Sequence, residues 1–198
     1  MTKIIDYYLA LISPWACLGH ERFVRMAKEN DAQVNIIPVD IGNVFSKTGG
    51  LPLTKRSVQR LNYRQMELAR WREESGVPIN FQPKFFPASD RIAAGMVISI
   101  VNSGGDALEL TGRFLNLVWI EDGDIADEAT AIEVANRAGF DGEALLKESQ
   151  KSEISALYEK NTMDAIKKGV FGAPTYIIDD EIFWGQDRLQ FAEKALKK

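Results

Sequence analysis

The sequence predicts an α/β fold that is interrupted by a block of helices. Residues 3–39 have the pattern of a strand, a helix and a second strand, and residues 175–197 that of a hairpin followed by a helix. Between them, apolar residues recur at helical spacing from about residue 42 to 168. A strand-helix-strand unit pairs its strands in parallel. We therefore expect a domain built from residues 1–41 and 169–198, with an inserted helical domain at 42–168.

The first three elements have clear local signals. Residues 3–12 are rich in Ile, Tyr and Leu, as buried strands are. Ser13 followed by Pro14 is typical of the N-cap and first turn of a helix, which we expect to end near residue 30. Residues 33–39 then form a second β-rich run, which completes the unit.

The rest of the chain divides at turn residues. A stretch with glycine and three prolines at residues 75–90 predicts a loop within the helical block. Two short β-rich runs, 175–178 and 182–184, flank acidic residues and predict a hairpin. Residues 187–197 predict a terminal helix that ends in lysines. Helices inside the block are expected at residues 56–74, 91–101, 107–120, 127–138 and 144–168.

Composition excludes several classes of protein. The chain has 198 residues, 45% of them hydrophobic, and a formal net charge of -4, so it can bury a core without metals or disulfides. One cysteine and one histidine exclude an internal disulfide and an all-Cys/His zinc site, and we expect no metal. A pI near 5.2 argues against nucleic acid as a partner. Without a signal-peptide pattern or a long apolar run, we expect no membrane partner, a cytoplasmic location and a small-molecule ligand.

Three short motifs lie where strands meet helices or loops. Ser13 precedes a helix whose free N–H groups stabilise an anion or a thiolate, or it is only the helix cap. Ala173-Pro174 starts a strand and could offer main-chain groups to an extended peptide, or the proline only sets the direction of the strand. Gln186 and Asp187 could bind an amino-acid head group, although an N-cap is the commoner role of such an aspartate.

The order of these elements is that of a thioredoxin-like fold with an inserted all-helical domain. Proteins of that fold normally have a Cys-x-x-Cys pair at the start of the first helix. This chain has Ser13 and Ala16 at those positions. Thiol-disulfide exchange through that motif is therefore chemically impossible.

The chain resembles the 2-hydroxychromene-2-carboxylate isomerases, bacterial relatives of the kappa-class glutathione transferases. The resemblance rests on Ser-Pro-Trp at 13–15, Phe-Gly-Ala-Pro-Thr at 171–175 and Trp-Gly-Gln-Asp-Arg-Leu at 184–189. It implies glutathione as cofactor, a homodimer, and a role in aromatic catabolism. The implied reaction interconverts 2-hydroxychromene-2-carboxylate and trans-o-hydroxybenzylidenepyruvate by reversible addition of the glutathione thiolate.

The resemblance also implies residue roles. Ser13 would donate a hydrogen bond to the glutathione sulfur and hold it as thiolate, which agrees with the effect of a donor and a helix N-terminus on a thiol pKa. The backbone of Ala173, before a cis Pro174, would pair with the cysteinyl part. The γ-glutamyl end would be held by Trp184, Gly185, Gln186 and Asp187, with Asp187 facing its ammonium group.

An anionic aromatic substrate needs a cation and flat apolar walls. Lys55 and Arg60 are candidates for its carboxylate, and Trp15 and Phe85 for the walls, although each could instead be a solvated charge or a core residue. Thr54 stands where the family has asparagine, and Phe85 where it has tyrosine. Both changes remove polar groups expected to face the substrate, so the ring specificity stays open.

Two other functions remain compatible with the sequence. One is a kappa-like transferase that conjugates glutathione to an electrophile and releases the adduct. The other is a binding module without catalysis, which is disfavoured because all three glutathione motifs are retained together. We assign no catalytic role to Cys17 or His20.

Overall fold

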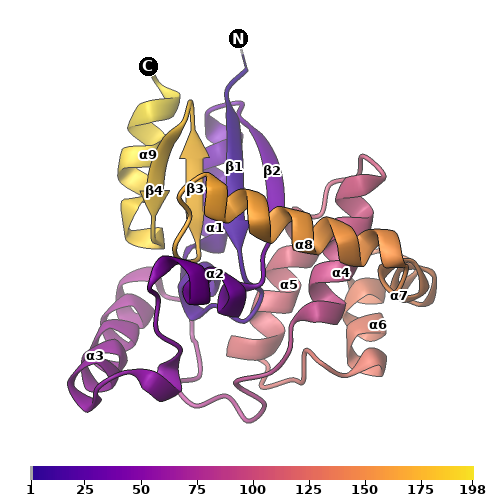
Figure 1. Cartoon of the computed structure of the whole chain (residues 1–198), viewed down its shortest axis with the longest axis horizontal. Coiled ribbons are helices and arrows are strands. Elements are labelled where there is room, and N and C mark those ends of the chain that lie inside the picture. The colour runs from indigo at the N-terminus through magenta and orange to yellow at the C-terminus, as the bar shows by residue number, and fades with distance from the viewer. Residues whose placement is uncertain (1) are drawn as a thin grey trace.

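A computed structural model describes residues 2–198, and it confirms the thioredoxin-like α/β fold (Figure 1). The described residues form one four-stranded sheet in the order β2-β1-β3-β4. The strands are β1 (Ile4–Leu9), β2 (Gln33–Pro38), β3 (Thr175–Ile178) and β4 (Glu181–Trp184). The β1–β2 pair is parallel, whereas β3 is antiparallel to both β1 and β4. Asp179 and Asp180, both with positive φ, form the hairpin turn.

Alternating side chains of β1 belong to opposite faces of the sheet. Tyr7 packs against Phe23 of α1 (Pro14–Glu29), with ring centroids 4.4 Å apart. Tyr8 belongs to a second apolar cluster with Val44 of α2 (Ile41–Thr48) and Ala165 of α8 (Ser152–Lys167). Figure 1 shows α2 and α8 in front of the sheet and α1 behind it. The sheet is therefore covered on both faces.

The remaining helices lie mostly where the spacing predicts them. The bounds are α3 Val58–Ser75, α4 Arg91–Asn102, α5 Leu108–Trp119, α6 Glu128–Arg137, α7 Gly142–Ser149 and α9 Leu189–Leu196, with short 3₁₀ helices η1 at Leu53–Lys55 and η2 at Gln186–Arg188.

The prediction of one continuous helix over residues 144–168 is wrong. Lys151 has extended backbone, with φ -66° and ψ 145°, and separates α7 from α8. The turn lets α7 pack against α4 and α6 while α8 runs across the front of the sheet (Figure 1). Periodicity alone does not register such a break, because both helices keep the same apolar spacing.

The main hydrophobic core continues from the sheet into the inserted helices. It joins Leu9 and Phe23 to Val97 of α4 and to Phe114 of α5, all fully buried. The division into two domains stays a prediction. Among residues 2–198, none of the helices combines the length and the apolar character needed to cross a membrane.

Helix α3 is mostly exposed, because Leu68 is the one buried residue among its 18. It lies at the edge of the molecule, near the ends of β3 and β4 (Figure 1). Its N-cap is Ser57, whose hydroxyl accepts a hydrogen bond from the Arg60 amide, and it ends at Gly76 in the left-handed conformation. An exposed helix beside the end of the sheet forms one wall of a cleft.

Candidate active site

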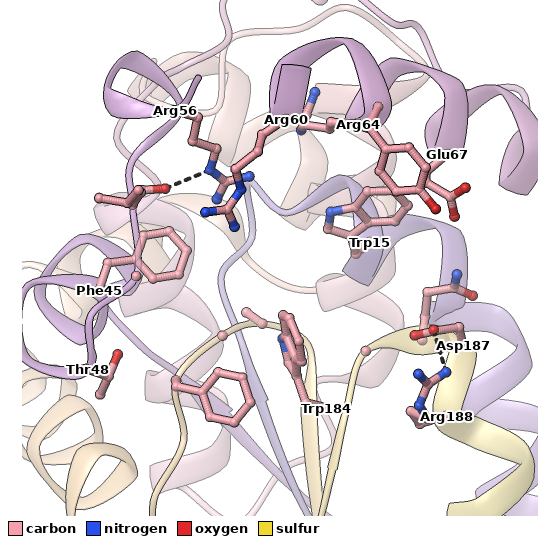
Figure 2. Close-up of a pocket in the computed structure, with 18 of the residues that line it drawn as sticks. Trp15, Phe45, Thr48, Arg56, Arg60, Arg64, Glu67, Trp184, Asp187 and Arg188 are labelled. Atoms are coloured by element: carbon pink, nitrogen blue, oxygen red, sulfur yellow. Dashed lines mark hydrogen bonds and ion pairs between the residues drawn. The ribbon is translucent and has the colours of Figure 1, made fainter. Parts of the chain in front are cut away.

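A cleft of about 740 Å³ lies between α3 and the end of the sheet where β3 begins and β4 ends (Figure 2). Its volume is in the range of small-molecule sites. The lining residues named below are Trp15, Phe45, Thr48, Arg56, Arg60, Tyr63, Arg64, Glu67, Trp71, Phe171, Gly172, Ala173, Trp184, Gly185, Gln186, Asp187 and Arg188. The second and third sequence motifs therefore meet at one place, together with Trp15 of the first.

Ser13 links the first motif to the second. It is the N-cap of α1, and its Oγ accepts a hydrogen bond from the Ala16 amide at 3.2 Å. The same hydroxyl donates to the carbonyl of Ala173, also at 3.2 Å, across 160 positions of the chain. The capping role is confirmed. The hydroxyl also lies beside the cleft, because Ala173 lines it.

The loop that positions Ser13 is fixed by a buried carboxylate. Asp90 Oδ2 accepts a hydrogen bond from the Leu11 amide at 2.8 Å, and Tyr158 donates to Oδ1 at 3.5 Å. Burial raises the pKa of Asp90 to about 6, although the Leu11 amide lowers it. Asp90 thus joins the helical block to the segment between β1 and α1.

The second motif has the cis Ala173–Pro174 peptide that the resemblance implies. The Pro174 carbonyl accepts a hydrogen bond from the Gly185 amide at 2.9 Å, which ties this motif to the third. A Cβ atom at position 172 would overlap the indole Nε1 of Trp184. Glycine at 172 therefore lets Trp184, which is 52% exposed, lie over this segment.

The third motif forms one end of the cleft. Gln186 is buried, and Arg22 donates hydrogen bonds to its side-chain and backbone oxygens. Asp187 is half-buried and pairs with Arg188 at 2.6 Å. The N-cap interpretation of Asp187 is wrong: α9 begins at Leu189 with no side-chain cap, and η2 follows Gly185. Asp187 thus lines the cleft with its carboxylate paired to Arg188 and does not cap a helix.

Three arginines of the opposite wall line the cleft at intervals of four residues: Arg56, Arg60 and Arg64. Arg56 Nε donates to the Leu51 carbonyl at 2.7 Å. Burial, and then repulsion from Arg60, lowers the pKa of Arg56. Burial, and then repulsion from Arg56, lowers the pKa of Arg64 to about 10. Of the three, sequence reasoning identified Arg60 and missed Arg56 and Arg64.

Aromatic side chains complete the walls. Trp15 lines the cleft as expected, and Phe171 packs against Trp184 with ring centroids 4.7 Å apart. Phe45, Tyr63 and Trp71 also line it and were not anticipated. Residues 60, 63, 64, 67 and 71 of α3 follow helical spacing, so this stripe was visible in the sequence as polar and aromatic residues along one helix face, whereas Arg56 precedes the helix.

Three predicted substrate residues lie outside the cleft lining. Thr54 and Lys55 belong to the exposed η1, and Phe85 is 37% exposed, with Lys84 Nζ 4.8 Å from the centre of its ring. The structure brings Trp15 and Arg60 to the cleft but not these three. Their contact with a substrate stays a prediction.

Cys17 and His20 are buried between α1 and α5. Burial raises the pKa of the Cys17 thiol to about 12, and its Sγ lies 3.7 Å from Asn116 Oδ1. Burial lowers the pKa of His20 to about 4, with Nε2 3.1 Å from the Leu108 carbonyl. A protonated, buried thiol is a poor nucleophile. Neither group provides redox or acid–base chemistry to the cleft.

This fold, with serine at the position of the first redox cysteine, defines a thioredoxin-like protein that does not use its own sulfur. A family model described as "DSBA-like thioredoxin domain" matches residues 4–197. The chain therefore belongs to the DsbA-like thioredoxin family, in the branch that contains the 2-hydroxychromene-2-carboxylate isomerases.

Two isomerases place it there, and a more distant relative is a kappa-class transferase. It is 31% identical to a 2-hydroxychromene-2-carboxylate isomerase of Sphingobium xenophagum over 99% of both chains. It is similar to a solved 2-hydroxychromene-2-carboxylate isomerase, with TM-score 0.81, 28% identity, and 98% of this chain and 94% of that chain covered. It is 21% identical to glutathione S-transferase kappa 1 of Rattus norvegicus, over 95% of this chain and 88% of the relative. The isomerase relatives support an isomerase role.

Proposed function

We propose that this protein is a glutathione-dependent isomerase of 2-hydroxychromene-2-carboxylate or a closely similar aromatic carboxylate, acting in aromatic catabolism. The observation that most supports the proposal is the hydrogen bond from Ser13 to the Ala173 carbonyl beside the cleft. It joins two glutathione motifs of the isomerase family at a site where the chain has no thiol of its own.

The residues at the sheet end of the cleft fit glutathione. Asp187 offers a carboxylate for the γ-glutamyl ammonium group, and Gly185 and Gln186 lie beside it on the same wall. Ala173 lines the middle of the cleft next to the Ser13 hydroxyl, where the cysteinyl part would lie. A Cβ atom at position 185 would overlap the Asp187 carboxylate, so glycine keeps that carboxylate in place. Charge, amide groups and space are all of the kind the tripeptide needs.

Glutathione, when bound, supplies a thiolate that adds reversibly to the conjugated double bond of the ring-opened substrate and so permits rotation about it. The Ser13 hydroxyl can turn from the Ala173 carbonyl to donate to the sulfur, while the N-terminus of α1 adds partial positive charge. Both interactions favour the thiolate over the thiol. Arg60 binds the substrate carboxylate, and Trp15 contacts the aromatic ring.

An absorbance assay tests the proposal. 2-Hydroxychromene-2-carboxylate is mixed with the protein, and formation of trans-o-hydroxybenzylidenepyruvate is followed with and without glutathione. We expect interconversion that requires both protein and glutathione. Turnover that is independent of glutathione, or no turnover at all, contradicts the proposal.

The second candidate is a kappa-like transferase that joins glutathione to a hydrophobic electrophile. The kappa-class relative and the aromatic walls of the cleft favour it. A stable adduct separates the two candidates, because the isomerase restores the thiol and the transferase consumes it. Incubation with glutathione and a general aryl electrophile, followed by chromatography of the product, detects such an adduct.

We also propose that the protein is a homodimer, as the family resemblance implies. Helix α3 leaves Val58 and Met66 62% and 55% exposed, and an interface between copies would cover such side chains. Sedimentation equilibrium measures the mass directly. A mass of 22.2 kDa, that of one chain, would contradict the dimer.

A further inference from the structure

The arginine wall, defined as Arg56, Arg60 and Arg64, has more positive charge than one carboxylate requires. A single guanidinium already binds a carboxylate through two parallel hydrogen bonds. Figure 2 shows these three side chains along the upper part of the cleft, with Asp187 and Arg188 at its other end. Asp187, the proposed partner of the glutathione ammonium group, is therefore well separated from the arginine wall.

The charges of the arginine wall are not balanced by the protein. None of the ion pairs within residues 2–198 includes Arg56, Arg60 or Arg64. Glu67 lines the same cleft, but its carboxylate pairs with Arg70 of the same helix. Repulsion between neighbouring guanidiniums adds to burial in lowering the pKa of Arg56 and of Arg64. Unpaired like charges gathered at a cleft are the arrangement that an anionic ligand stabilises.

We propose that the arginine wall binds the aromatic substrate as a dianion, with one guanidinium on its carboxylate and a second on a phenolate oxygen. The inference rests on the proposed function, because opening of the hemiketal ring creates that second anion. The hemiketal hydroxyl loses its proton to water, and its oxygen becomes the ketone oxygen. The bond from the same carbon to the aryl oxygen breaks, and its electron pair leaves on that oxygen as phenolate.

A guanidinium suits the phenolate because it stays protonated at neutral pH and stabilises the leaving oxygen through charge and hydrogen bonds. The Arg56 guanidinium lies 6.0 Å from the ring centre of Phe45, and both residues line the cleft. The aromatic ring of the substrate can therefore contact Phe45 while its phenolate oxygen lies near Arg56. A free phenol has a pKa of about 10. A cation within reach lowers such a pKa by about 1 to 3, so the bound phenol loses its proton at about pH 7 to 9.

The test uses trans-2-hydroxycinnamate, which has a carboxylate and a phenol but no ketone. Its phenol is titrated by absorbance while bound at saturation, and its dissociation constant is measured by tryptophan fluorescence. We expect a bound phenol pKa about 1 to 3 below that of the free probe. At pH 8 we expect trans-cinnamate, which lacks the phenol, to bind about tenfold more weakly.

Substitutions test whether the arginine wall causes the lowered pKa of the bound phenol. Arg56→Gln and Arg64→Gln are each expected to return the bound phenol pKa toward the free value, whereas Arg72→Gln, which changes an exposed arginine of α3 outside the cleft lining, leaves it unchanged. A bound phenol that titrates like the free one overturns the inference. It is also overturned if Arg56→Gln and Arg64→Gln weaken glutathione binding and leave the probe unaffected, because the wall would then serve the glutathione carboxylates.

The outcomes separate this inference from the proposed function. If the probe binds as phenolate but no isomerisation occurs, the dianion site stands and the isomerase proposal fails. If isomerisation occurs and the probe binds as a neutral phenol, the isomerase proposal stands and the dianion site fails.

Discussion

The two walls of the cleft are built in different ways. The sheet wall, formed by the segments around Ser13, Ala173 and Gln186, is tied together by hydrogen bonds between distant parts of the chain. The α3 wall is an exposed helix with Leu68 as its one buried residue. The difference teaches that the fold itself fixes the wall proposed to bind glutathione. The wall proposed to face the aromatic substrate depends instead on exposed residues that can change with little cost to stability.

The largest expected effect is on the sheet wall. Ser13→Ala removes the donor proposed for the glutathione sulfur, and we expect kcat/KM of the isomerisation to fall about 100-fold or more. The lost cap should cost only about 1 kcal/mol of unfolding free energy. Asp127→Ala, which removes the cap of α6 far from the cleft lining, is the matched control and should keep the rate. Full activity of Ser13→Ala would reduce Ser13 to a helix cap.

The next prediction concerns binding of glutathione alone, without the aromatic substrate. Asp187→Asn removes the charge proposed to face the γ-glutamyl ammonium group, so the dissociation constant of glutathione should rise about tenfold or more. Calorimetric titration measures it. Asp180→Asn in the hairpin turn is the control, since asparagine tolerates its positive φ of 66°. Equal affinities in Asp187→Asn and the unchanged protein would remove Asp187 from the site.

Substitutions in the α3 wall should weaken binding of the aromatic substrate and leave glutathione binding unchanged. Arg60→Gln is expected to raise KM for the aromatic carboxylate about tenfold and to leave glutathione binding unchanged. Lys55→Gln tests the prediction made from the sequence, because Lys55 lies outside the cleft lining. The geometry favours a smaller rise of KM for Lys55→Gln than for Arg60→Gln. If steady-state kinetics show a larger rise of KM for Lys55→Gln than for Arg60→Gln, Lys55 is the residue that binds the substrate carboxylate.

The last effect is on stability and not on activity, and it comes from Asp90, which supports the sheet wall. Its pKa is raised from the ordinary 3.8 to about 6. Between these values the folded protein holds a proton that the unfolded chain has released, so the free energy of unfolding falls as pH rises from about 4 to 6. Asp90→Asn lacks this loss, so above pH 6 it should be more stable than the unchanged protein, by at most about 3 kcal/mol, and below pH 4 no more stable.

Thermal unfolding of Asp90→Asn and the unchanged protein across pH 4 to 8 measures the difference. Asp164→Asn is a useful control, because the pKa of this exposed carboxyl is lowered by Lys160 and its removal should not stabilise at high pH. If the difference in stability between Asp90→Asn and the unchanged protein does not depend on pH, the raised pKa of Asp90 in the folded protein is contradicted.

The parts that could be predicted from sequence depend on local chemistry. Ser13-Pro14 specifies a helix start whatever surrounds it, and the acidic turn between β3 and β4 specifies a hairpin. The three glutathione motifs lie at such junctions, so the order of elements was enough to bring the second and third into one cleft with Trp15 and to place Ser13 beside it.

The parts that could not be predicted depend on how elements pack. Lys151 stands between α7 and α8, which both contact α4, whereas α6 contacts α7 and α2 contacts α8; no local signal predicts this break. Arg64 belongs to the cleft because α3 lies across from the ends of β3 and β4, and Arg56 because it lies between η1 and that helix; sequence alone gives neither position. Thr54 and Lys55 lie close by in sequence but in the separate turn η1.

A count of glutathione after the reaction tests the central claim most directly. 2-Hydroxychromene-2-carboxylate is supplied in large excess over glutathione, and free thiol is measured before and after isomerisation is complete. Because the proposed isomerase restores the thiol in every turnover, we predict product in excess over glutathione, with the thiol unchanged. Product limited to the amount of glutathione, with the thiol consumed, would contradict the account and favour the transferase.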